Sequence, residues 1–90
     1  MEQEVHIAGV VVYAQPALLD SVLSCIGEIP GADVHGTDAS GKAVITLETD
    51  SARRAVDYMD AMRSLPGVLN VALVYQHAEP LAAIDQEVSQ

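Results

Sequence analysis

The spacing of apolar residues in the first third of the chain predicts a strand followed by a helix. Residues 5–14 (VHIAGVVVYA) form an apolar, β-branched run without an acid, which is typical of a strand. Pro16 suits the first turn of a helix, and apolar residues then recur at helical spacing as far as Ile29. This predicted stripe consists of Leu18, Leu19, Val22, Leu23, Ile26 and Ile29.

The remaining two thirds repeat this pattern after a second, shorter strand. We expect strands over residues 32–36 and 42–48, joined by a turn rich in Asp, Ser and Gly. Asp50 or Ser51 can cap a second helix, and residues 68–76 (VLNVALVYQ) form the predicted last strand. The apolar stripe of the second helix consists of Ala52, Ala55, Val56, Met59 and Met62.

Two Pro-Gly pairs, at residues 30–31 and 66–67, end the two predicted helices. Proline disfavours helical geometry in the residue before it, and glycine accepts the turn that follows. The chain is therefore β-α-β written twice, over 5–36 and 42–76, which predicts an α+β fold of the ferredoxin-like βαββαβ type. Because crossovers are right-handed, a four-stranded antiparallel sheet carries both helices on one face. We expect strands 5–14 and 42–48 at its centre.

We expect this ferredoxin-like domain to occupy residues 1–78 and a flexible acidic C-terminal tail to occupy 79–90. The chain contains 13 acids and four bases, for a net charge of −9. Nucleic acids and anionic membranes require clustered Lys or Arg and are therefore poor partners. A basic partner is favoured, although acidity can also serve solubility alone. One cysteine, no membrane-length apolar run and no positively charged leader favour the cytoplasm. A monomer is the simplest oligomeric state.

The sheet face without helices is predicted to have an apolar centre. Along residues 42–48, odd positions should face the helices and even positions should face away. Along residues 68–76, we expect Leu69, Val71, Leu73 and Tyr75 to face the helices, and Asn70, Ala72, Val74 and Gln76 to face away. The predicted binding surface consists of Ile7, Gly9, Val11, Val44, Thr46, Glu48, Ala72 and Val74.

An exposed apolar patch of this kind indicates a partner. Three alternatives to a partner are that the patch is small, that the C-terminal tail covers it, and that two copies pair through it.

Residues that often carry chemistry do not combine into a catalytic or metal site. His6, His35 and His77 lack metal-ligand spacing, and Cys25, at the border of the first helical stripe, lacks a CxxC partner. No glycine-rich phosphate loop follows a strand. Acylphosphatases share this topology, but they rely on an arginine in the first loop, which here is AQPA. We therefore expect no enzymatic activity, no metal and no cofactor.

The segments IPGADVHGTDASGKAVITLE and LPGVLNVALVYQH, together with the first strand ending VVVYA, resemble the NapD family over residues 5–78. The resemblance implies a cytoplasmic chaperone for the catalytic subunit of periplasmic nitrate reductase. Such chaperones bind the twin-arginine (Tat) signal peptide of that enzyme and delay its export until its cofactors are installed. They carry no cofactor themselves.

An acidic domain with an apolar face suits a peptide that has two arginines and an apolar stretch. Glu48 is the predicted arginine partner, with Asp50, Asp38 and Glu79 as weaker candidates. A peptide helix lying across the sheet is favoured over an added edge strand. The alternative function is a small-ligand regulatory domain of the ACT or RAM kind, acting as a dimer, although such domains usually accompany a second domain.

Overall fold

Four strands and two helices follow one another in the predicted order. The computed structural model describes residues 4–80, and the remaining residues of the predicted tail, 81–90, lie outside this part. The elements are β1 (Glu4–Ala14), a short 3-10 helix η1 (Pro16–Leu18), α1 (Leu19–Ile26), β2 (Ala32–Thr37), β3 (Lys42–Thr49), α2 (Ala52–Arg63) and β4 (Val68–Pro80).

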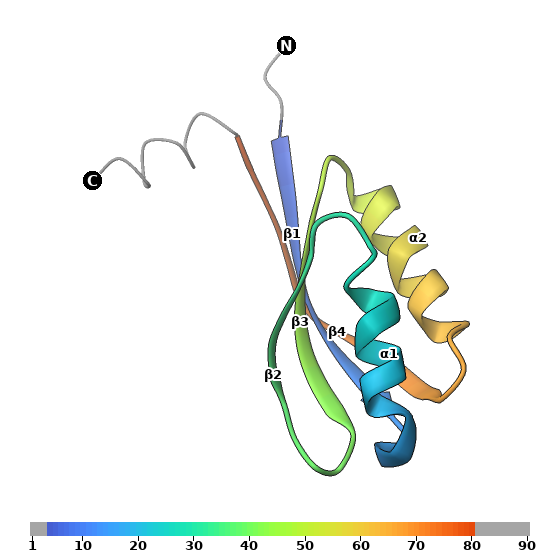
Figure 1. Cartoon of the computed structure of the whole chain (residues 1–90). Helices are drawn as coiled ribbons and strands as arrows, with labels where there is room; N and C mark the ends of the chain where they lie inside the picture. The colour runs from blue at the N-terminus through green and yellow to red at the C-terminus, as the bar shows by residue number, and fades with distance from the viewer. Residues whose placement is uncertain (1–3, 81–90) are drawn as a thin grey trace.

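The sheet is antiparallel, with strand order β2-β3-β1-β4. Both helices lie against the same face of the sheet and leave the other face bare (Figure 1). The predicted ferredoxin-like fold, with β1 and β3 at the centre, is therefore confirmed.

The core lies between this sheet and the two helices and is entirely aliphatic. Because Phe and Trp are absent from the chain, small and branched side chains fill the space. Val22 and Ile26 come from successive turns of α1, and Met59 and Met62 come from α2. The sheet contributes Ala8, Val10, Val12, Ala14, Ala43, Ile45, Leu47 and Val71, and α2 also contributes Ala55. Each large side chain removed from water in this way contributes roughly 1.5–3 kcal/mol.

The helix ends show the chemistry that the sequence predicts. The Ser51 hydroxyl accepts a hydrogen bond from the backbone N–H of Arg54 at 3.1 Å and so caps α2. After the helices, Gly31 and Gly67 adopt φ angles of +81° and +93°, which L side chains rarely adopt. However, α1 ends at Ile26 with Gly27 as its C-cap, and α2 ends at Arg63 with Ser64 as its C-cap. The prediction that the two Pro-Gly pairs end the helices is therefore wrong, and the pairs instead turn the chain back into the sheet.

The buried stripes of the helices are narrower than predicted. Leu18 belongs to η1 rather than to α1 and is 38% exposed, and Val56 on α2 is 48% exposed. Cys25, expected at the edge of the core, is exposed. A two-layer domain of this size covers only one side of each short helix, so the outer members of each predicted stripe remain in contact with water.

The last strand is longer than predicted, because β4 continues past residue 76 to Pro80. It stays paired with β1 to its end, where Glu4 lies opposite Pro80. Gln76, His77 and Ala78 are all exposed, so no alternation of apolar and polar residues marks this part as a strand.

Candidate functional site

Six of the eight predicted binding residues belong to the paired strands β1 and β3, and the register of this pair places all six on the bare face. Ile7, Gly9 and Val11 lie opposite Glu48, Thr46 and Val44, respectively. Residues directly opposite each other in an antiparallel pair project to the same face. Their chain neighbours Ala8, Val10, Ile45 and Leu47 are all buried in the core. The six residues therefore project away from the helices, as predicted.

A bulge changes the arrangement on β4. Gly9 pairs with Tyr75, but the next residue, Val10, pairs with Leu73, which leaves Val74 as an extra residue. One extra residue inverts the alternation of the strand beyond it. The prediction that Tyr75 faces the helices is therefore wrong, since it shares the bare face with Gly9. Gln76, predicted on the bare face, lies opposite the core residue Ala8.

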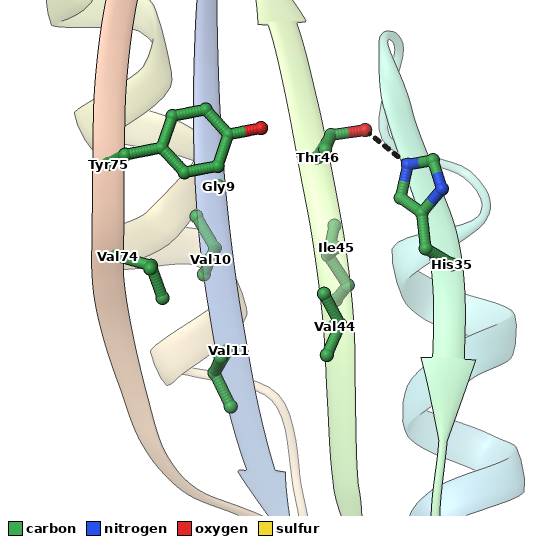
Figure 2. A pocket seen from close by; sticks show the side chains of 9 residues that line it. All are labelled: Gly9, Val10, Val11, His35, Val44, Ile45, Thr46, Val74 and Tyr75. Atoms are coloured by element: carbon green, nitrogen blue, oxygen red, sulfur yellow. Dashed lines mark hydrogen bonds between the residues drawn. The ribbon is translucent and has the colours of Figure 1, made fainter.

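The other two predicted members on β4 lie next to this bulge. Ala72 pairs with Val11 on the bare face, as predicted. Val74, the extra residue, is 65% exposed and extends over the bare face beside β1 (Figure 2). The eight predicted residues thus form one continuous surface across β1, β3 and β4.

The bare face contains a hollow of about 390 Å³. The Tyr75 ring borders it on the β4 side, His35 borders it on the β2 side, and Val11 and Val44 lie between them (Figure 2). The full lining is Gly9, Val10, Val11, His35, Val44, Ile45, Thr46, Val74 and Tyr75. A concave, largely apolar surface with a few polar groups is typical of a binding site. Ile7, Glu48 and Ala72 lie outside the hollow and flank it.

A hydrogen bond fixes the β2 side of the hollow. The Nε2 atom of His35 lies 2.7 Å from Oγ1 of Thr46. His35 is the extra residue of a register shift between Val34 and Gly36 on β2, and it shares the bare face with Asp33, two residues before it. The sequence prediction missed both His35 and Tyr75: a bulge inverts the face of Tyr75, and the prediction assigned no faces to residues 32–36.

Charge is distributed unevenly along the bare face. Asp33 lies opposite Thr46 and so shares the bare face with Glu48. Among the side chains that the structure describes, neither carboxylate forms an ion pair. The three arginines form ion pairs elsewhere, within or beside α2: Arg53 with Asp57, Arg54 with Asp50 and Arg63 with Asp60. At the opposite end, Lys42 Nζ lies 5.9 Å from the centroid of the Tyr13 ring.

The weaker candidate carboxylates differ from Glu48 in their surroundings. Asp50 is 3.1 Å from the guanidinium of Arg54. Asp38 lies in the turn between β2 and β3, where hydrogen bonds from the Ser40 side chain and the Lys42 backbone lower the pKa of its carboxyl group. The side chain of Glu79 lies outside the described part of the structure. Of the three candidates whose side chains are described, Glu48 is the one whose carboxylate has no ion pair or hydrogen bond with another described residue.

Two further findings concern residues 4–80 only. No group of three or more His, Cys, Asp and Glu side chains in this range is arranged to hold a metal ion. None of the helices in the same range has both the length and the apolar character that a membrane crossing requires.

Comparison with known proteins agrees with the fold and with the sequence resemblance. The chain is 27% identical to the chaperone NapD of Escherichia coli K12 over 75 residues, which cover 82% of this chain and 86% of the relative. It is 24% identical to the chaperone NapD of Haemophilus influenzae, covering 82% and 81% of the two chains.

Solved structures give the same result. The solution structure of the E. coli Tat proofreading chaperone protein NapD matches with a TM-score of 0.77 and 26% identity, covering 83% of this chain and 80% of that chain. A transcriptional regulatory protein of the AsnC family from Pyrococcus furiosus matches with a TM-score of 0.63 and 16% identity, covering 77% of this chain and 49% of that chain. The latter likeness shows a shared fold alone.

The family model described as NapD protein matches residues 5–80, nearly the whole described part of the chain. The curated relatives are named chaperones rather than enzymes, as the sequence resemblance implies. The chain therefore belongs to the NapD family of chaperones.

Proposed function

We propose that this protein is a cytoplasmic chaperone that binds the twin-arginine signal peptide of the periplasmic nitrate reductase catalytic subunit. Binding delays export until cofactor insertion and folding are complete. Membership of the NapD family supports this proposal, as does the description of the E. coli relative as a Tat proofreading chaperone.

One observation supports the bare sheet face as the binding site: an apolar hollow with two carboxylates at one end that form no ion pair with a described side chain. The hollow is suited to the apolar stretch of a signal peptide, and Glu48 and Asp33 are suited to its arginines. Arginine forms strong, directional hydrogen bonds with carboxylates. Such contacts fix orientation and encounter rate more than affinity. The peptide-binding residues that we propose are Ile7, Gly9, Val11, Val44, Thr46, Glu48, Ala72 and Val74, with His35 and Tyr75 added.

The apolar contact supplies most of the binding free energy in this proposal. Burying about 400 Å² of apolar surface contributes roughly 10 kcal/mol before other terms. Loss of rigid-body freedom and ordering of the peptide offset much of this gain. The remainder is compatible with a micromolar or tighter complex. Because the hollow lies on the face of the sheet and not along an edge, we propose that the peptide binds as a helix lying across the sheet.

Titration calorimetry tests the function directly, with a synthetic signal peptide of the nitrate reductase from the same organism. We expect binding at micromolar or lower concentration and amide shifts around Val11, Val44 and Tyr75 in NMR spectra. A peptide of scrambled sequence serves as control. If tens of micromolar peptide produce neither heat of binding nor changes in amide chemical shifts, the chaperone proposal is refuted.

A pair of matched variants locates the site. Val44 on the bare face and Val56 on α2 are 45% and 48% exposed, respectively. A charge introduced at either position is equally accessible to water, but only Val44→Glu places it in the hollow. We expect Val44→Glu to abolish measurable binding and Val56→Glu to leave affinity unchanged. Equal effects of the two substitutions would exclude the bare face as the site.

A further inference from the structure

We infer that the bare face binds its peptide in one direction only. The arginines lie at the end formed by Asp33 and Glu48, and the apolar stretch continues over the hollow toward Tyr13 and Lys42. This inference rests on the proposed function, and it uses Asp33 and Glu48 together to fix the direction of the peptide.

The acidic end offers two carboxylates on neighbouring strands. Asp33 on β2 lies opposite Thr46, and Glu48 follows Thr46 by two residues on the same face of β3. Diagonal neighbours of this kind are roughly 7–8 Å apart between Cα atoms, within the joint reach of two adjacent arginine side chains. Both carboxylates are exposed, and neither forms an ion pair with a described side chain. His77, opposite Ile7 at this end, adds no negative charge.

The opposite end does not favour arginine. Tyr13 lies opposite Lys42 on the bare face, and the ammonium group of Lys42 lies over the Tyr13 ring. The nearby Asp38 carboxylate balances the charge of Lys42, and it already accepts hydrogen bonds from Ser40 and from the Lys42 backbone. Two negative charges at one end therefore face an approximately neutral, aromatic surface at the other. The apolar hollow lies between the two ends, because its lining residues Val11 and Val44 lie between them along β1 and β3.

This asymmetry favours one of the two ways in which a signal peptide can lie on the face. With its arginines at Asp33 and Glu48, the apolar stretch meets Val11, Val44 and then the Tyr13 ring. In the reverse orientation, the arginines would meet the Lys42 ammonium group, and apolar side chains would cover two carboxylates. Covering a charged group without a partner is strongly unfavourable.

Paramagnetic labelling of the peptide determines its direction. One peptide carries a nitroxide beside the arginines, and a second carries it at the end of the apolar stretch. We expect the first label to broaden the amide signals of Asp33 and Glu48, and the second to broaden those of Tyr13 and Lys42. Three outcomes would overturn the inference: the opposite pattern, equal broadening of both ends of the bare face by each label, or broadening of neither end. Absence of binding in the calorimetric experiment would instead refute the proposed function.

Charge variants give an independent test. We expect Asp33→Lys and Glu48→Lys each to weaken binding about three- to tenfold at low salt. The control Glu28→Lys changes the net charge equally at an exposed position after α1 and should weaken binding less than twofold. The peptide affinities of Lys42→Glu and of its control Arg53→Glu should agree within about twofold. If Lys42→Glu strengthens binding well beyond Arg53→Glu, the arginines lie at the Lys42 end and the inferred direction is wrong.

Discussion

The ring of Tyr75 lies directly over Gly9, the residue opposite it on β1 (Figure 2). A Cβ atom on Gly9 would overlap the ring carbons, so the absence of a side chain at position 9 allows the ring to lie flat against the sheet. The ring in turn borders the hollow. The shape of the proposed site therefore depends on one glycine whose conformation is otherwise that of an ordinary strand residue.

Replacing this glycine should change binding more than stability. Gly9→Ala displaces the Tyr75 ring into the hollow, and we expect the affinity for the signal peptide to fall about fivefold or more. The free energy of unfolding should change by less than about 1 kcal/mol. Alanine is no worse than glycine in a strand, and the ring can move away from the sheet into the open hollow without disturbing the core. Calorimetry and urea denaturation measure the two effects.

A double-mutant cycle separates displacement of the ring from other effects of the new methyl group. In a Tyr75→Ala background, Gly9→Ala has no ring to displace, so it should change affinity by less than about twofold. An equal loss of affinity in both backgrounds would show that the ring is not the link between Gly9 and the peptide.

Val44 and Ile45 are neighbours in β3 with opposite environments, which predicts opposite consequences of truncation. Ile45 is fully buried, whereas Val44 is 45% exposed on the bare face. We expect Ile45→Ala to lower the free energy of unfolding by about 2–5 kcal/mol. Val44→Ala should lower it by less than about 1 kcal/mol but should weaken peptide binding. If Val44→Ala proves the more destabilising of the two in urea denaturation, the assignment of the two faces is wrong.

The fold could be predicted from the sequence because local signals agree with one another. Alternation along residues 42–48 gives the correct faces of β3, and the Pro-Gly pairs at 30–31 and 66–67 mark the turns that lead the chain from each helix back into the sheet. Right-handed crossovers then leave few topologies to choose from. The end of β4 escaped prediction because exposed, polar residues pair there with β1.

The candidate site could be predicted only in part, because of a bulge on β4 and because no faces were predicted for β2. Ile7, Gly9, Val11 and the open-face residues of β3 follow from strict alternation, which holds along β1 and β3. Tyr75 lies beyond a register shift, and alternation assigns a residue beyond such a shift to the wrong face. A glycine in a central strand that faces a nearby aromatic residue is one signal that could have placed Tyr75. For His35, simple alternation along β2 from Asp33 is the signal that could have placed it on the bare face.

The hydrogen bond between His35 and Thr46 predicts a spectroscopic effect. Thr46→Val removes the hydroxyl, so we expect a clear change in the Nε2 chemical shift of His35. The rate at which the ring N–H proton of His35 exchanges with water should change as well. His6, whose neighbours Val5 and Ile7 face the opposite side of the sheet, should not change. Because the bond is exposed, the free energy of unfolding should fall by no more than about 1 kcal/mol.

A conservative variant completes this test. Thr46→Ser keeps the hydroxyl and should preserve the His35 shift in nitrogen-detected NMR spectra. If Thr46→Ser and Thr46→Val change the His35 shift equally, the hydroxyl is not the partner of the ring.

The turn between β2 and β3 predicts a dependence of stability on pH. Hydrogen bonds from Ser40 and the Lys42 backbone lower the pKa of Asp38 from its usual value of 3.8. Because the folded-state pKa is the lower one, the charged carboxylate stabilises the fold fully above about pH 3.8, and this contribution disappears as the pH falls through the folded-state pKa. Asp38→Asn should therefore lower the Tm slightly at neutral pH. The Tm difference from the unmodified protein should shrink toward zero by about pH 2 in calorimetric scans. A Tm difference that stays constant over this range would show that the charge of Asp38 does not stabilise the turn.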